Sequence, residues 1–87
     1  MACNAPGAEC RGMDERVITW SRGRRLRIVV MDVPADFDRL VGIIRDDSRR
    51  TDDRDLLAAD VSTVFGRHVR MTSSSDLVGE EITIRVG

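Results

Sequence analysis

The chain has 87 residues, of which 41% are hydrophobic and 33% are charged, and its formal net charge is -1. This length favours one domain, and the composition is too apolar for a disordered chain and too polar for a membrane protein. The longest apolar run, Ile28 to Met31, is far shorter than the roughly 20 residues of a membrane-spanning helix. A near-neutral chain does not attract nucleic acid as a whole, so any such attraction must be local.

Residues 1–14 have no hydrophobic periodicity and include Ala, Gly, Pro and Asn. We therefore expect a disordered leader, followed by a single small domain over residues 15–87. The leader lacks the apolar stretch of a secretion signal, and a disulfide between Cys3 and Cys10 would close only a small surface loop. We expect a cytoplasmic protein with reduced thiols.

The segment from residue 16 to residue 31 contains two runs rich in β-branched residues around a central glycine, which predicts a β-hairpin. A two-residue loop would place Trp20 opposite Arg25. A three-residue loop instead places Trp20 opposite Leu26 and gathers the apolar side chains on one face. We expect the second register, in which Arg25 and Arg27 point away from the apolar face.

A helix is expected after Pro34, which suits the first helical turn, and Asp36 and Asp38 suit the positive end of the helix dipole. The i, i+3, i+4, i+7 spacing of its apolar stripe is the clearest helical signal in the chain. The stripe consists of Phe37, Leu40, Val41 and Ile44. Gly42 inside this helix indicates either a close approach to a neighbouring element or a merely tolerated glycine.

The charged tract 45–55 contains no apolar residue, so it is expected to be an exposed linker between two helices. Either Asp52 or Asp53 can cap the second helix, and Gly66 is expected to end it. The buried stripe of this helix is predicted to be Leu57, Val61, Val64 and Phe65.

Residues 68–72 and 81–86 alternate between apolar and polar side chains, and a stretch containing Ser and Gly connects them. This pattern predicts a second β-hairpin. The expected fold is therefore an α+β domain of order ββααββ, with an antiparallel four-stranded sheet and two helices packed on one face.

Catalytic and metal-binding patterns are not recognisable in the sequence. His68 and the two leader cysteines lack the close paired spacing of a zinc site, and His68 is expected to be an ordinary strand residue. The three serines 73–75 lack the strand-turn-helix context of a nucleophile, and the paired carboxylates lie in exposed polar stretches. We expect no enzyme, no metal, no cofactor and no small-molecule ligand.

Positive charge is concentrated in the first hairpin. Residues 1–31 contain six arginines and three acids, a net +3, whereas residues 32–60 contain nine aspartates and five arginines, a net -4. The candidate binding residues for an acidic partner or for phosphates are Arg16, Arg22, Arg24, Arg25 and Arg27. The candidate acidic counter-surface is Asp46, Asp47, Asp52, Asp53 and Asp55. An alternative is that the arginines only protect a sheet edge from aggregation.

The run RRLRIVV followed by DFDRLVGII resembles the start of ubiquitin-like domains, including those that associate head to tail through a basic strand and an acidic motif. The resemblance covers residues 16–47. It ends there because a charged linker and a second helix follow, where those domains place a strand. What the resemblance implies is contact between identical copies.

The function that these patterns favour is a non-catalytic protein-interaction or regulatory module. Its arginine-rich hairpin is expected to bind an acidic surface, either on a protein partner or on a second copy of the chain in a homo-oligomer. The alternative is a nucleic-acid-binding regulator that uses the same hairpin. No membrane partner is expected.

Overall fold

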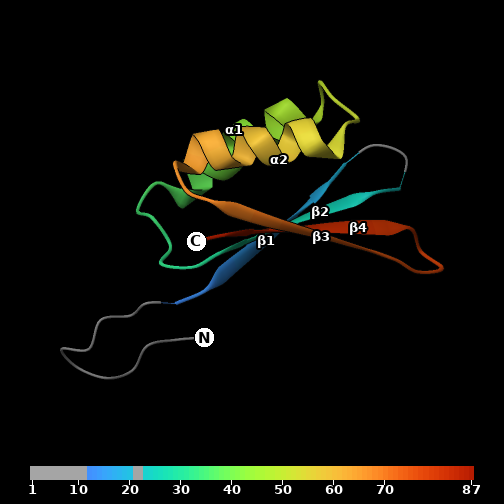
Figure 1. The fold of residues 1–87 in the computed structure, drawn as a ribbon, viewed down its shortest axis with the longest axis horizontal. Helices are drawn as coiled ribbons and strands as arrows, with labels where there is room; N and C mark the ends of the chain where they lie inside the picture. Colours follow the sequence, from blue (N-terminus) through green and yellow to red (C-terminus); the bar gives the residue numbers. More distant parts are fainter. Residues whose placement is uncertain (1–11, 21–22) are drawn as a thin grey trace.

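The computed structural model describes residues 12–20 and 23–87. Two β-hairpins form one four-stranded sheet, and two helices lie side by side on the same side of it (Figure 1). Most of the expected leader and the whole of Arg22 lie outside the described residues. The elements are β1 (Asp14–Thr19), β2 (Arg25–Val30), α1 (Phe37–Ser48), α2 (Arg54–Phe65), β3 (Val69–Ser75) and β4 (Glu80–Val86).

The element order ββααββ is confirmed, but the prediction of a purely antiparallel sheet is wrong. The strand order is β1-β2-β4-β3, and β2 pairs with β4 in parallel. The composition of the last two strands explains this order. Ile82, Ile84 and Val86 of β4 are fully buried, so β4 belongs in the middle of the sheet, whereas the serine-rich β3 is mostly exposed and suits an edge.

The two helices determine the strand directions. They return the chain to the end of the sheet at which β2 stops, because Val86 pairs with both Val30 and Val69. β3 therefore starts at the end of the sheet at which β2 stops, and it runs in the opposite direction to β2. Since β4 rather than β3 occupies the place next to β2, the central pair is parallel.

The register of the first hairpin also differs from the prediction. Ile18 pairs with Leu26, and the Trp20 N–H donates to the Arg24 carbonyl at 2.9 Å, instead of Trp20 lying opposite Leu26. The guanidinium of Arg24 then lies 3.9 Å from the centre of the Trp20 ring, a contact that stabilises this pairing. The observed register differs from the predicted one by an even number of residues, so the same side chains still face the helices.

The helices begin and end close to the predicted signals. Asp53 caps α2 by accepting the N–H groups of Asp55 and Leu56 at 2.9 and 3.3 Å, and Gly66 ends it in the left-handed conformation with φ 65°. The predicted linker is shorter than expected, because α1 continues through the buried Ser48. The two apolar stripes pack onto the sheet, with Val64 and Phe65 only partly buried.

Candidate functional site on the uncovered sheet face

The sheet has one face covered by the helices and one face that no described element covers (Figure 1). Alternation along the strands assigns each side chain to one of these faces. Three rows of side chains cross the uncovered face, and we number them from the hairpin tips towards the opposite end. The first row is Thr19, Arg25, Glu81 and Ser74. The second row is Val17, Arg27, Thr83 and Thr72. The third row is Glu15, Val29, Arg85 and Arg70.

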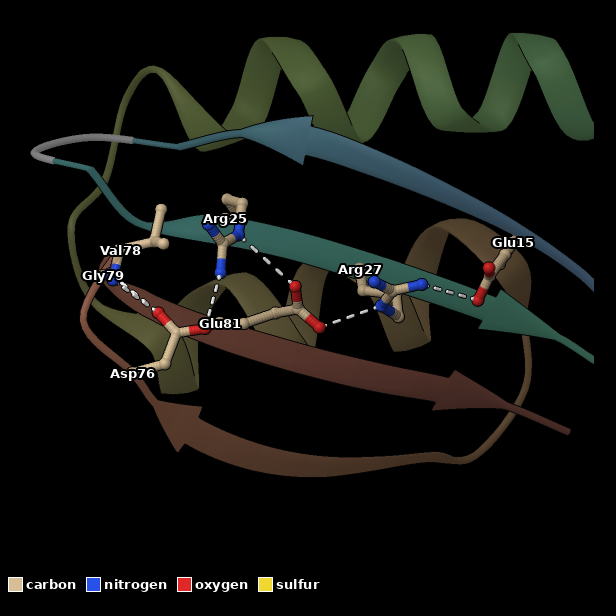
Figure 2. A network of polar contacts seen from close by, with 7 residues as sticks. All are labelled: Glu15, Arg25, Arg27, Asp76, Val78, Gly79 and Glu81. Atoms are coloured by element: carbon tan, nitrogen blue, oxygen red, sulfur yellow. Dashed lines mark hydrogen bonds and ion pairs between the residues drawn. The ribbon is translucent and has the colours of Figure 1, made fainter.

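Arg25 and Arg27 belong to an ion-pair network that joins three strands (Figure 2). Arg27 donates from Nε to Glu81 Oε1 at 2.9 Å and lies 2.9 Å from Glu15 Oε2. Arg25 lies 3.4 Å from the other oxygen of Glu81 and 3.6 Å from Asp76 Oδ2. The hydrogen bond from Arg27 lowers the pKa of Glu81, and the same carboxylates raise the pKa of Arg27. Arg25 and Arg27 are therefore neutralised within the chain.

Asp76 is held in place by the turn of the second hairpin. Its Oδ1 accepts the backbone N–H groups of Val78 and Gly79 at 2.8 and 3.0 Å, as Figure 2 shows. These two hydrogen bonds are the main reason that the pKa of Asp76 is lowered. The turn thus fixes a carboxylate beside the tip of the first hairpin, where it faces Arg25.

Arg16 lies on the other face of the sheet, beside the helices. Its guanidinium is 3.0 Å from Asp14 Oδ2 and 3.2 Å from Asp38 Oδ1, and it lies 5.0 Å from the centre of the Phe37 ring. The contact with Asp14 is the main cause of the raised pKa of Arg16. This arginine therefore links β1 to the start of α1.

Arg24 is also on the helix side. It stacks on Trp20, donates to the Asp52 carbonyl at 3.0 Å, and approaches Glu80 to 3.7 Å. The indole of Trp20 donates to the Thr51 carbonyl at 2.9 Å. These contacts join the first hairpin to the helix junction, so Arg24 has a structural role.

The predicted arginine cluster is therefore divided between the two faces of the sheet. Each of its members among the described residues has an acidic neighbour within 4 Å in the same chain, namely Arg16, Arg24, Arg25 and Arg27. Such exposed pairs are individually weak, but together they offset the local charge that a partner would bind. That these arginines bind a partner stays a prediction, and a partner must compete with the chain's own acids.

The predicted acidic counter-surface lies at the junction of α1 and α2. The structure places Asp46 and Asp47 in the last turn of α1, Asp52 and Asp53 in the connection, and Asp55 in the first turn of α2. Asp53 is engaged as the helix cap. The tract 45–55 contains four arginines beside these five aspartates, so the junction carries both signs of charge.

A second pair of arginines, which the sequence reasoning missed, lies in the third row. Arg70 of β3 and Arg85 of β4 are directly opposite each other, and both are exposed. Within residues 12–20 and 23–87 neither has an ion pair or a side-chain hydrogen bond. The nearest acid in the row, Glu15, is separated from Arg85 by the buried Val29 and is turned towards Arg27.

A pocket of about 230 Å³ adjoins this pair. We call it the arginine pocket, and its lining residues are Met31, His68, Arg70, Arg85, Val86 and Gly87. No acidic side chain lines it. Pockets that hold drug-sized ligands have volumes of about 300–1,000 Å³. The arginine pocket is smaller, so it suits a single small group rather than a nucleotide.

One signal in the sequence could have found this pair. Arg70 alternates with Val69 and Met71, and Arg85 alternates with Ile84 and Val86, so both arginines belong to polar faces of their strands. Their opposition depends on the register of the second hairpin, which the sequence pattern alone did not specify.

Comparison of the chain with protein-family models, with curated proteins and with solved structures gave no match. In the part of the chain that the structure describes, no group of three or more His, Cys, Asp or Glu side chains is placed to hold a metal ion. None of the described helices is long and apolar enough to cross a membrane.

Proposed function

We propose that this chain is a small non-catalytic interaction module that binds an acidic surface of a protein partner with the uncovered face of its sheet. Arg70 and Arg85 supply the charge for recognition, and Arg25 and Arg27 lie on the same face towards the hairpin tips. The observation that carries the proposal is the opposed pair Arg70 and Arg85, which has no acidic partner among the described residues.

Charge complementarity supports an acidic partner. Like charges directly opposite each other on neighbouring strands destabilise a sheet, whereas opposite charges stabilise it. In the first row the sheet follows this rule, because Arg25 is opposite Glu81. In the third row two like charges are opposite each other, because Arg85 pairs with Arg70. An acidic group supplied by a partner would balance these two positive charges.

The neighbourhood of the pair also supports a protein partner. Met31 lines the arginine pocket and is 49% exposed, so an apolar contact is available beside the charges. Methionine adapts well to varied partner surfaces. Nucleic acid, by contrast, would meet a chain whose net charge is -1 and whose first hairpin is neutralised by its own acids.

The test is fluorescence anisotropy with a labelled glutamate-rich peptide and, separately, a labelled DNA duplex. The double variant Arg70→Glu, Arg85→Glu is compared with the matched control Arg49→Glu, Arg50→Glu, which changes the same charge at the helix junction. We expect the wild type and the control to bind the peptide, and the pocket variant to bind at least about tenfold more weakly. Equal binding by both variants, or binding of the duplex in preference to the peptide, would overturn the proposal.

A further inference from the structure

We propose that the arginine pocket binds a phosphomonoester group, carried on a phosphorylated side chain of the partner. This inference rests on the proposed function, since the partner supplies the group, but it adds a chemical preference that a merely acidic surface does not have.

The positive charge of the pocket matches the negative charge of a phosphoryl group. Arg70 and Arg85 both line one pocket, and no acidic side chain lines it. A phosphorylated side chain carries a charge of about -1.5 to -2 at neutral pH and three acceptor oxygens, whereas a carboxylate carries a single charge and two oxygens. One arginine can satisfy a carboxylate through its two parallel donors, so a second arginine at the same place favours the phosphoryl group.

The two arginines come from neighbouring strands and line the same pocket. Arg70 and Arg85 are directly opposite on β3 and β4, where Cβ atoms are about 4.5–5.5 Å apart, so both side chains can reach one tetrahedral anion. His68 adds a third polar side chain to the lining. The pocket also adjoins β3, which is an edge strand, so a partner segment can approach from the side without displacing any described element.

The volume and the charge together distinguish a monoester from other phosphates. About 230 Å³ is too small for a nucleotide but sufficient for a terminal group on a longer chain. A phosphodiester of nucleic acid has only one negative charge for each phosphate, so it would leave one of the two arginines without a counter-charge.

The test uses three peptides that are identical except at one central position, which carries phosphoserine, glutamate or serine. Binding to the full chain is measured by calorimetry for the wild type, Arg70→Gln, Arg85→Gln and the control Arg50→Gln. We expect the wild type and the control to bind the phosphoserine peptide at least about tenfold more tightly than the glutamate peptide, and each pocket variant to lose that preference.

The outcomes separate this inference from the proposed function. If the glutamate peptide binds as tightly as the phosphoserine peptide, the phosphoryl preference is wrong and the proposed function stands. If neither peptide binds, the proposed function fails as well.

Inorganic phosphate provides a second arm, followed by the NMR signals of the arginine Nε–H groups. We expect phosphate alone to shift the signals of Arg70 and Arg85 and to leave that of Arg50 unchanged. Equal shifts at all arginines would show attraction of anions to the whole surface and would overturn the pocket assignment. Circular dichroism of each variant confirms that it is folded.

Discussion

Arg70 and Arg85 are paired directly across β3 and β4, and both point to the face that the helices leave uncovered. On the same face, Arg25 and Arg27 share the carboxylate of Glu81. The two ends of this surface therefore differ. At the hairpin tips the arginines have acidic neighbours in the chain, whereas at the other end neither Arg70 nor Arg85 has an ion pair among the described residues. This difference, rather than the number of arginines, identifies the candidate site.

The first prediction concerns the stability of the arginine pair. Because the like charges repel each other, Arg85→Gln should raise the free energy of unfolding by about 0.2–1 kcal/mol. The gain should be larger at about 0.01 M salt than at about 1 M salt, where the Debye length falls from about 30 Å to about 3 Å. Urea unfolding of the wild type and of Arg85→Gln at the two salt concentrations measures this gain. A variant that is less stable than the wild type at low salt would contradict the repulsion between Arg70 and Arg85. A residue that lowers stability while it provides binding is typical of functional sites.

The acid dependence of stability tests the network around Glu81. The pKa of this carboxyl is lowered in the folded protein, mainly by the hydrogen bond from Arg27. The folded state therefore binds fewer protons than the unfolded state near the ordinary pKa of the group, so its contribution is present above that pKa and is lost as the pH falls through the folded value. Glu81→Gln should lower stability at neutral pH and weaken its decline below about pH 4.5.

Urea unfolding between about pH 3 and about pH 7 measures both effects of this substitution, within the range where carboxyl groups titrate. Asp60→Asn is the control, since Asp60 has no ion pair among the described residues. If the two variants have the same pH profile, Glu81 does not have the role assigned to it.

Two glycines should respond to alanine in opposite directions. Gly79 has φ 151°, and a Cβ there would clash with the Gly23 carbonyl oxygen, so Gly79→Ala should destabilise the hairpin tips by more than about 1 kcal/mol. Gly42 lies inside α1 with open space around it, so Gly42→Ala should stabilise the protein by about 0.5–1 kcal/mol. Thermal unfolding followed by circular dichroism compares the two, and a destabilising Gly42→Ala would indicate a close approach that the structure does not have.

Trp20 connects the first hairpin to the helix junction. Trp20→Phe removes the indole hydrogen bond to the Thr51 carbonyl and weakens the stacking of Arg24, so we expect a loss of about 1–2 kcal/mol. Chemical unfolding followed by circular dichroism measures the loss, because the variant has no other tryptophan to report by fluorescence. A change below about 0.5 kcal/mol would mean that the junction is held mainly by the core, since a typical hydrogen bond contributes at least that much.

The elements of this fold were predictable because each has a local signal. Three signals act within one or two turns of chain: the helical spacing from Phe37 to Ile44, the aspartate cap of α2 and the glycine at position 66. Of the two candidate caps, Asp52 and Asp53, the structure uses Asp53. Strand alternation likewise assigned Arg25 and Arg27 to the face away from the helices.

The strand order and the charge balance were not predictable in the same way. Alternation tells which face a side chain occupies, but not which strand lies beside it. The parallel pairing of β2 with β4 brings Glu81 to Arg27 across 54 positions of sequence, and this contact neutralises the cluster that looked exposed. The same limit hid the opposition of Arg70 and Arg85, because each is a single arginine within its own strand.

The most direct test of the account is NMR of the arginine Nε–H groups during titration with the phosphoserine peptide. If the third row of the uncovered face is the binding site, the signals of Arg70 and Arg85 shift with saturation. The signals of Arg25 and Arg27 move little, because these two arginines remain paired with their own acids. Shifts confined to the first hairpin, with Arg70 and Arg85 unchanged, would contradict the account.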